Sequence, residues 1–200
     1  FRHLLTDPLI GFLILIELDL GHPRDRVADR SQQRGPFTET VLGGAEAPIY
    51  PYQARVYYLR PCSRPTGGTV DAPVCLATDD GNQPIPTLVR QQVTATATTA
   101  RMTEVAVAEG IEAMRVLYGV DSDGDGTPDP PYIEAPTDIE FAQVVTVRVT
   151  VLVRSPKPTN GYDDSRRFYD LDGDGVTILN CTDDGLPCNY HRHVFTQSFQ

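Results

Sequence analysis

Several motifs that mark common enzyme classes are missing from this chain. It has no G-x-S-x-G, no phosphate-binding P-loop, no H-E-x-x-H and no G-x-G-x-x-G. Tryptophan is also absent, so the nine Tyr and seven Phe are expected in the core and the strands rather than in a sugar-stacking platform. No catalytic set stands out, and we expect a protein that is not an enzyme.

Positive charge is scarce. The chain has 17 Lys and Arg against 27 Asp and Glu, which gives a formal net charge of −10. An acidic chain is repelled by phosphate backbones, so nucleic acid is not expected as the primary partner. Much of the acidity lies in two Asp clusters, near residues 121–129 and 170–175, which are therefore candidate cation sites.

A long apolar run is missing as well. The most apolar segment is "PLIGFLILIELDL" at residues 8–20, where Glu17 and Asp19 interrupt the end. A bilayer span needs roughly 20 apolar residues, so this segment is too short and too charged to predict one. Pro23 and Pro36 then break any helix. We expect an apolar segment and polar linker over 1–35 and a β-rich head over 36–200, with membrane contact through the N-terminal segment left open.

Turn residues are abundant, with 17 Pro and 16 Gly. They favour a β-rich head with long loops over a helical bundle. Strands are predicted at 53–60, 87–98, 143–155 and 191–200. The clearest is "QVVTVRVTVLVRS" at 143–155, whose alternation predicts one buried face. That face would carry Val145, Val147, Val149, Val151 and Val153.

A short helix near 106–114 is predicted from the near-helical spacing of Val107, Ile111 and Met114. The following "RVLYGV" at 115–120 has the composition of a strand that leads into the first Asp cluster. The predicted fold class is therefore α+β: an antiparallel sheet with a short helix and long loops, preceded by the apolar N-terminal segment.

The four cysteines contain no C-x-x-C pair, so a zinc site or a thioredoxin-like motif is poorly supported. An even number in a loop-rich chain favours disulfides and an oxidising compartment over four reduced thiols. Three connectivities are possible. Local pairing is preferred because it closes one turn-rich loop in each case: Cys62 with Cys75, and Cys181 with Cys188.

The first Asp cluster matches the start of a D-x-D-x-D-G calcium loop, in which carboxylates at positions 1, 3 and 5 precede a glycine and a backbone carbonyl. The predicted ligands are Asp121, Asp123, Asp125, the Thr127 carbonyl and Asp129. The bidentate Glu expected at position 12 is replaced by Tyr132, and Glu134 is the nearest acid beyond it. An acidic turn with solvated charges is the alternative.

The second cluster repeats the first half of this pattern. Its predicted ligands are Asp170, Asp172, Asp174 and the Val176 carbonyl. Positions 9 and 12 hold Ile178 and Cys181, so this site is expected to be weaker, unless outside acids such as Asp163, Asp164, Asp183 or Asp184 complete it. His191 and His193 alternate on the final strand, but no third ligand accompanies them, and exposed strand histidines are the simpler interpretation.

The stretch "VAEGIEAMRVLYGVDSDGDGTPDPPYIEA" and the later "VVTVRVTVLVRS" together resemble PilW-type minor pilins, which are type IV pilus assembly proteins. The first part matches through Glu109, Gly110, Ile111, Glu112, Val116, Tyr118, Gly119, Val120 and Asp121. The second matches through Val144, Val147, Arg148, Leu152, Val153, Arg154 and Ser155. The resemblance covers about residues 50–200. The N-terminus departs from the family, because "GFLILIE" is not followed by a long apolar helix.

The resemblance implies a structural role in a type IV pilus: assembly, adhesion, twitching or DNA uptake at a bacterial cell surface, reached through the inner membrane. Other pilin subunits would be the partners, possibly in filament self-assembly. The alternatives are a secreted calcium-binding adhesive module unrelated to pili and a secreted polysaccharide hydrolase that uses paired carboxylates.

Overall fold

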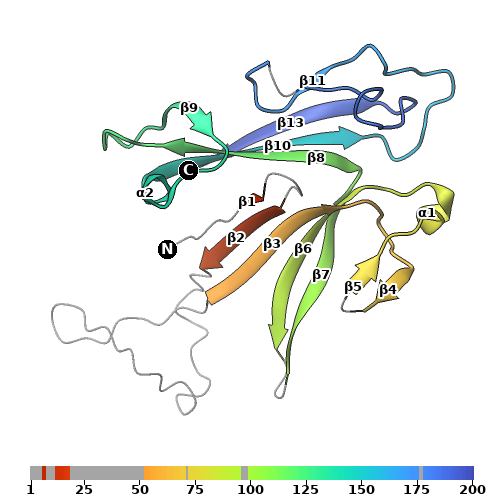
Figure 1. Cartoon of the computed structure of the whole chain (residues 1–200), viewed down its shortest axis with the longest axis horizontal. Helices are drawn as coiled ribbons and strands as arrows, with labels where there is room; N and C mark the ends of the chain where they lie inside the picture. Colours follow the sequence, from red (N-terminus) through yellow and green to blue (C-terminus); the bar gives the residue numbers. More distant parts are fainter. Residues whose placement is uncertain (1–5, 8–11, 19–51, 71, 96–98, 176–177) are drawn as a thin grey trace, which may run out of the picture.

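The computed structural model describes residues 6–7, 12–18, 52–70, 72–95, 99–175 and 178–200. Two antiparallel sheets make up most of this part of the chain (Figure 1). The boundary expected between 1–35 and 36–200, and the linker itself, lie outside the described residues. Within the described residues, no helix is long and apolar enough to cross a membrane.

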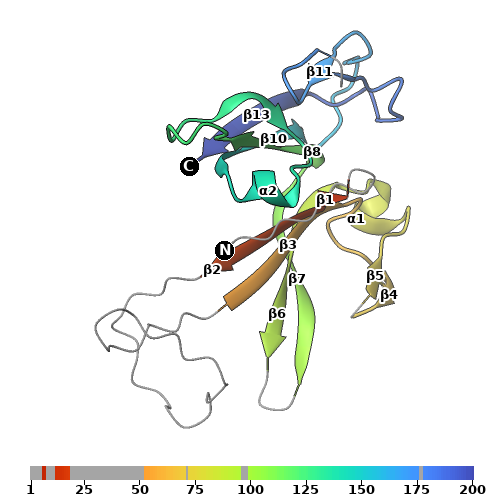
Figure 2. The ribbon, with the colours of Figure 1, turned by 60° about the vertical axis from the view of Figure 1, so that its left-hand side comes forward.

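The first sheet has five strands in the order β1-β2-β3-β6-β7, and all neighbours are antiparallel. The strands are β1 (Thr6–Asp7), β2 (Phe12–Leu18), β3 (Tyr52–Arg60), β6 (Thr87–Ala95) and β7 (Ala100–Glu109). The predicted strands at 53–60 and 87–98 therefore both belong to this sheet. The β6–β7 hairpin projects away from the second sheet in both views (Figures 1 and 2).

The second sheet has four strands in the order β13-β10-β8-β9, again antiparallel. Its strands are β8 (Ile111–Val120), β9 (Asp129–Ile133), β10 (Val144–Arg154) and β13 (Arg192–Phe199). The strands predicted at 143–155 and 191–200 pair with each other here. Two small ribbons, β4 (Gly67–Thr69) with β5 (Ala72–Val74) and β11 (Tyr169–Asp170) with β12 (Ile178–Leu179), lie in the long loops.

The described helices are single turns, α1 (Asp79–Asn82) and α2 (Asp138–Phe141). Helix α2 has a capping box between Thr137 and Glu140. The helix predicted near 106–114 is wrong, because β7 and β8 occupy this stretch and Gly110 separates them. The structure is thus richer in strand than the α+β prediction, although its antiparallel, loop-rich character is as expected.

Gly110 is the point at which the chain leaves the first sheet for the second. Its φ is +82°, and an added Cβ would lie 2.9 Å from the Arg154 carbonyl oxygen. The Gly110 N–H donates to the Pro86 carbonyl at 2.7 Å, and the Gly110 carbonyl accepts from the Arg154 N–H at 2.8 Å. A left-handed conformation and a close backbone approach both require glycine here. The spacing of Val107, Ile111 and Met114 that resembled a helix is therefore interrupted by a corner between two strands.

The central strand β10 is packed on both faces, which corrects the expectation of one buried face. Val147 and Val149 pack on one side against Val116 and Tyr118. On the other side Leu152 is fully buried. That second face is covered because the chain after β10 folds back over it, bringing residues such as Tyr169 and Leu171 against Leu152. The deeply buried positions of β10 are therefore Thr146, Thr150, Leu152 and Arg154, and the valines are only partly buried.

Both predicted local disulfides are present, Cys62–Cys75 and Cys181–Cys188. The first closes the loop between β3 and β6, and the second closes the loop that leads into β13. Each links segments that have little regular structure of their own. A cross-link of this kind typically stabilises a fold by about 2–4 kcal/mol.

Candidate functional site

The first acidic loop joins β8 to β9. Asp121 organises it, because its carboxylate accepts the N–H groups of Gly124 at 2.7 Å, Asp125 at 3.2 Å and Gly126 at 2.8 Å. Asp129 closes the loop by accepting the Ser122 N–H at 2.8 Å. The loop is therefore shaped by its own carboxylates.

Three of the predicted ligands converge in this loop. Carboxylate oxygens of Asp121, Asp123 and Asp129 all lie within 4.8 Å of one another. Asp125 is turned to Thr127 instead, since its Oδ1 accepts the Thr127 N–H at 2.7 Å. Glu134, the nearest acid beyond the loop, is ion-paired with Arg115. The geometry supplies three adjacent carboxylates, which is part of the oxygen set that calcium prefers.

Local hydrogen bonds hold two of these carboxylates, Asp121 and Asp129, in their charged form. The pKa of Asp121 is lowered, chiefly by the N–H of Gly126 and then by those of Gly124 and Asp125. The pKa of Asp129 is lowered mainly by the Ser122 hydroxyl. Hydrogen bonds to a carboxylate favour its ionised form. Asp121 and Asp129 therefore bring negative charge to the converging group.

The second acidic loop, after β11, is arranged differently. Asp170 organises this loop as Asp121 organises the first, because its carboxylate accepts the N–H of Gly173 at 2.7 Å and that of Gly175 at 2.9 Å. These hydrogen bonds lower the pKa of Asp170. Asp172 is ion-paired, with Oδ1 3.2 Å from Nε of Arg115. Asp170, Asp172 and Asp174 do not form a converging group within the described residues, and Val176 lies outside them.

Three of the four acids suggested as outside ligands have other partners. Asp163 accepts the Ser165 N–H at 2.9 Å, and Asp184 accepts the Asn180 N–H at 2.7 Å. Asp164 is fully buried and belongs to the charge network described next. The two histidines contact different aromatic rings. The ring centroid of His191 lies 3.7 Å from that of Tyr162, and the ring centroid of His193 lies 4.6 Å from that of Phe195.

A buried charge network joins the second sheet to the loop that covers it, and it was not predicted from the sequence. Arg192 at the start of β13 donates to both oxygens of Glu112 and, at 3.0 Å, to Oδ2 of Asp164. Side chains of these three residues are at most 1% exposed. Arg154 lies 3.4 Å from Glu112 and donates to the Pro84 carbonyl at 2.7 Å. Two buried arginines thus balance two buried carboxylates.

Tyrosines complete this network. The Tyr162 hydroxyl donates to Oδ1 of Asp164 at 2.8 Å, and the Tyr169 hydroxyl donates to Oδ2 of Asp164 at 2.8 Å. The guanidinium of Arg154 stacks over the ring of Tyr190, 4.3 Å from its centroid. The pKa of Tyr169 is raised above its ordinary range by burial and by its bond to Asp164. Glu112 lies in the first of the two stretches quoted above and Arg154 in the second. Their partners are so far away along the chain that the sequence alone did not reveal the network.

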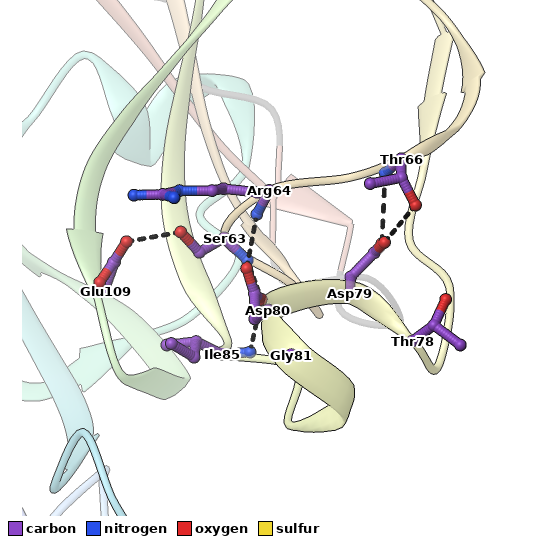
Figure 3. Close-up of a pocket in the computed structure, with 9 residues that line it drawn as sticks. All are labelled: Ser63, Arg64, Thr66, Thr78, Asp79, Asp80, Gly81, Ile85 and Glu109. Atoms are coloured by element: carbon purple, nitrogen blue, oxygen red, sulfur yellow. Dashed lines mark hydrogen bonds between the residues drawn. The ribbon is translucent and has the colours of Figure 1, made fainter.

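A polar hollow lies beside the first disulfide, around the turn that includes α1 (Figure 3). Asp80 accepts the backbone N–H groups of Ser63 at 2.8 Å, Arg64 at 3.0 Å and Ile85 at 2.9 Å. Asp79 is buried and accepts from the N–H of Leu76 at 2.7 Å and from the Thr66 hydroxyl. Both carboxylates therefore serve to hold the loop, and Cys62 and Cys75 beside Asp79 are bonded to each other.

Comparison with known proteins gives one family. A model of the family described as Type IV Pilus-assembly protein W matches residues 75–200, a stretch that contains both acidic loops, the second sheet and the charge network. No significant match was found among curated proteins or solved structures.

Proposed function

This chain belongs to the PilW family of type IV pilus assembly proteins, and from that premise we propose that it is a minor-pilin-like structural subunit whose loop at 121–129 is ordered by calcium. The family supports a location at the cell envelope or surface. The finer role, a subunit within or at the tip of the filament that supports assembly or adhesion, is our proposal.

The observation that supports calcium is the convergence of Asp121, Asp123 and Asp129 within 4.8 Å of one another. Like charges this close repel, and a cation relieves that repulsion. Calcium takes six to eight oxygens, so water or backbone carbonyls such as that of Thr127 would have to supply the others. A partial ligand set suits the weak affinities of extracellular calcium modules, with Kd of about 10⁻⁴–10⁻³ M. The second loop is a weaker candidate, because Asp172 is already ion-paired with Arg115.

Calcium is expected to raise the melting temperature of the protein. With the Kd range above, 10 mM calcium would raise Tm by about 3–10 °C relative to chelator, since a ligand that binds only the folded state stabilises it in proportion to the logarithm of its concentration over Kd. Differential scanning calorimetry of the full chain measures this shift. Asp123→Ala is expected to remove most of it, whereas Asp138→Ala, at an exposed acid outside both loops, should leave it unchanged.

Two results would count against the calcium proposal. One is a wild-type Tm that is the same in calcium and in chelator. The other is a shift that both alanine variants retain in full, because this would place the cation elsewhere.

A further inference from the structure

One arginine of β8 contacts both acidic regions of the molecule. Arg115 is ion-paired through Nη1 with Glu134 and through Nε with Asp172, whose Oδ1 lies 3.2 Å away. Glu134 directly follows β9, and Asp172 belongs to the second acidic loop. A guanidinium is planar and carries five N–H donors, so it can hold two carboxylates at once. We call Arg115 with these two carboxylates the Arg115 clasp.

The Arg115 clasp is partly shielded from water. The side chain of Arg115 is 24% exposed and that of Asp172 is 12% exposed, whereas Glu134 is 41% exposed. Arg115 lies opposite Thr150 of β10, on the sheet face that also carries Leu152 and that the chain after β10 covers. Ion pairs are screened less where their partners are partly buried. The contact with Asp172 is therefore the better protected of the two.

A short strand connects the clasp to the first acidic loop. Asp129, one of the three converging carboxylates, is the first residue of β9 and pairs with Val120 of β8. Ile133, at the other end of β9, pairs with Tyr118. Ordering of Asp129 therefore holds β9 on β8, and this places Glu134 beside the arginine.

Asp172 connects the clasp to the second acidic loop. Its backbone N–H donates to Oδ1 of Asp170 at 3.1 Å. Asp170 also accepts the N–H groups of Gly173 and Gly175, and through these bonds it shapes the loop. Asp172 thus lies between Arg115 and the residue that organises the second loop.

We propose that Arg115 is a positioning residue that makes the two acidic loops order together, so that calcium bound in the loop at 121–129 also orders residues 170–175. Coupling between two sites needs a physical element that both sites bias. Here that element is the guanidinium shared by Glu134 and Asp172. The calcium step rests on the proposed function, whereas the clasp itself can be tested without calcium.

Hydrogen–deuterium exchange of the full chain, followed by mass spectrometry, measures this coupling. In chelator, Arg115→Gln is expected to raise amide exchange rates about 3- to 5-fold in both 129–134 and 170–175, the effect of losing a partly exposed ion pair on local opening. In the wild type, 10 mM calcium should slow exchange in 121–129 and in 170–175. In Arg115→Gln, calcium should slow exchange in 121–129 only.

Arg148→Gln is the matched control. Arg148 lies on β10, on the same sheet face as Arg115, and its guanidinium stacks over Tyr132 of β9, 3.8 Å from the ring centroid. Among the described residues it forms no ion pair with either acidic loop. This variant also removes an arginine that contacts β9, but calcium should still slow exchange in both loops. Thermal melts should show that each variant is folded.

Three results would overturn the proposal. The first is exchange in 170–175 that Arg115→Gln leaves unchanged in chelator. The second is a wild type in which calcium slows exchange in 121–129 but not in 170–175. The third is slowing in 170–175 that Arg115→Gln retains in full, because calcium would then act there directly. If calcium slowed exchange in neither loop of the wild type, the calcium proposal would fail, and the chelator measurements would still decide whether the clasp exists.

Discussion

Replacing Glu112 with alanine is expected to lower the free energy of unfolding by about 3–5 kcal/mol, the cost of removing one partner from a buried ion pair. Glu112 is 1% exposed and contacts both Arg192 and Arg154, so its loss leaves two buried guanidiniums without their shared carboxylate. Asp164 remains on Arg192 but does not contact Arg154 in any ion pair among the described residues. Urea denaturation of the full chain, followed by circular dichroism, measures the change.

Glu134→Ala is the matched control for this experiment. Glu134 also pairs with an arginine, Arg115, but its side chain is 41% exposed. Ion pairs at such positions contribute about 0–1 kcal/mol, so this variant should be nearly as stable as the wild type. Equal losses for Glu112→Ala and Glu134→Ala would contradict the view that burial makes the network important.

Replacing Leu152 with alanine is expected to cost about 2–5 kcal/mol, which is the range for large-to-small changes at buried leucines. Leu152 is fully buried, packed against Tyr169 and Leu171 from the chain that returns over the second sheet. The variant leaves a cavity between β10 and this covering loop. The same urea denaturation measures the loss.

Val107→Ala is the corresponding control, because Val107 is 50% exposed on β7. Surface substitutions of this kind usually change stability by no more than about 0.5 kcal/mol. If Leu152→Ala were as mild as Val107→Ala, the outer face of β10 would not be the well-packed face that the structure shows.

Local sequence patterns predicted the local structure well where a pattern had one interpretation. The alternating valines of 143–155 gave a strand, and the turn-rich loops gave the two short-range disulfides. The prediction at 106–114 was wrong because three apolar residues at helical spacing are also compatible with two strands and a corner. Gly110 was the signal against a helix, since glycine disfavours helix interiors.

The rest of the fold could not be read from the sequence because it depends on partners far apart along the chain. The face of β10 that carries Leu152 is buried by residues that follow a long polar excursion. Likewise, Glu112 and Arg192 are 80 residues apart. In the acidic loop the spacing grouped four carboxylates as candidate ligands, and only the structure separates Asp125, whose Oδ1 accepts the Thr127 N–H, from the three that converge.

The family match covers the head from residue 75 onward and supports the pilus-related interpretation over the alternatives of an unrelated adhesive module or a hydrolase. The structure also shows where the sequence around the acidic loop lies in the fold. The loop joins β8 and β9, two paired strands of the second sheet.

Immunogold electron microscopy of pili on intact cells, with an antibody against residues 52–200, tests the central claim most directly. Gold particles are expected on the filaments themselves, sparse along them or concentrated at their tips, and none on cells that lack the gene. Labelling that stays at the cell envelope, with every filament unlabelled, would contradict the claim that this chain is a subunit of the pilus.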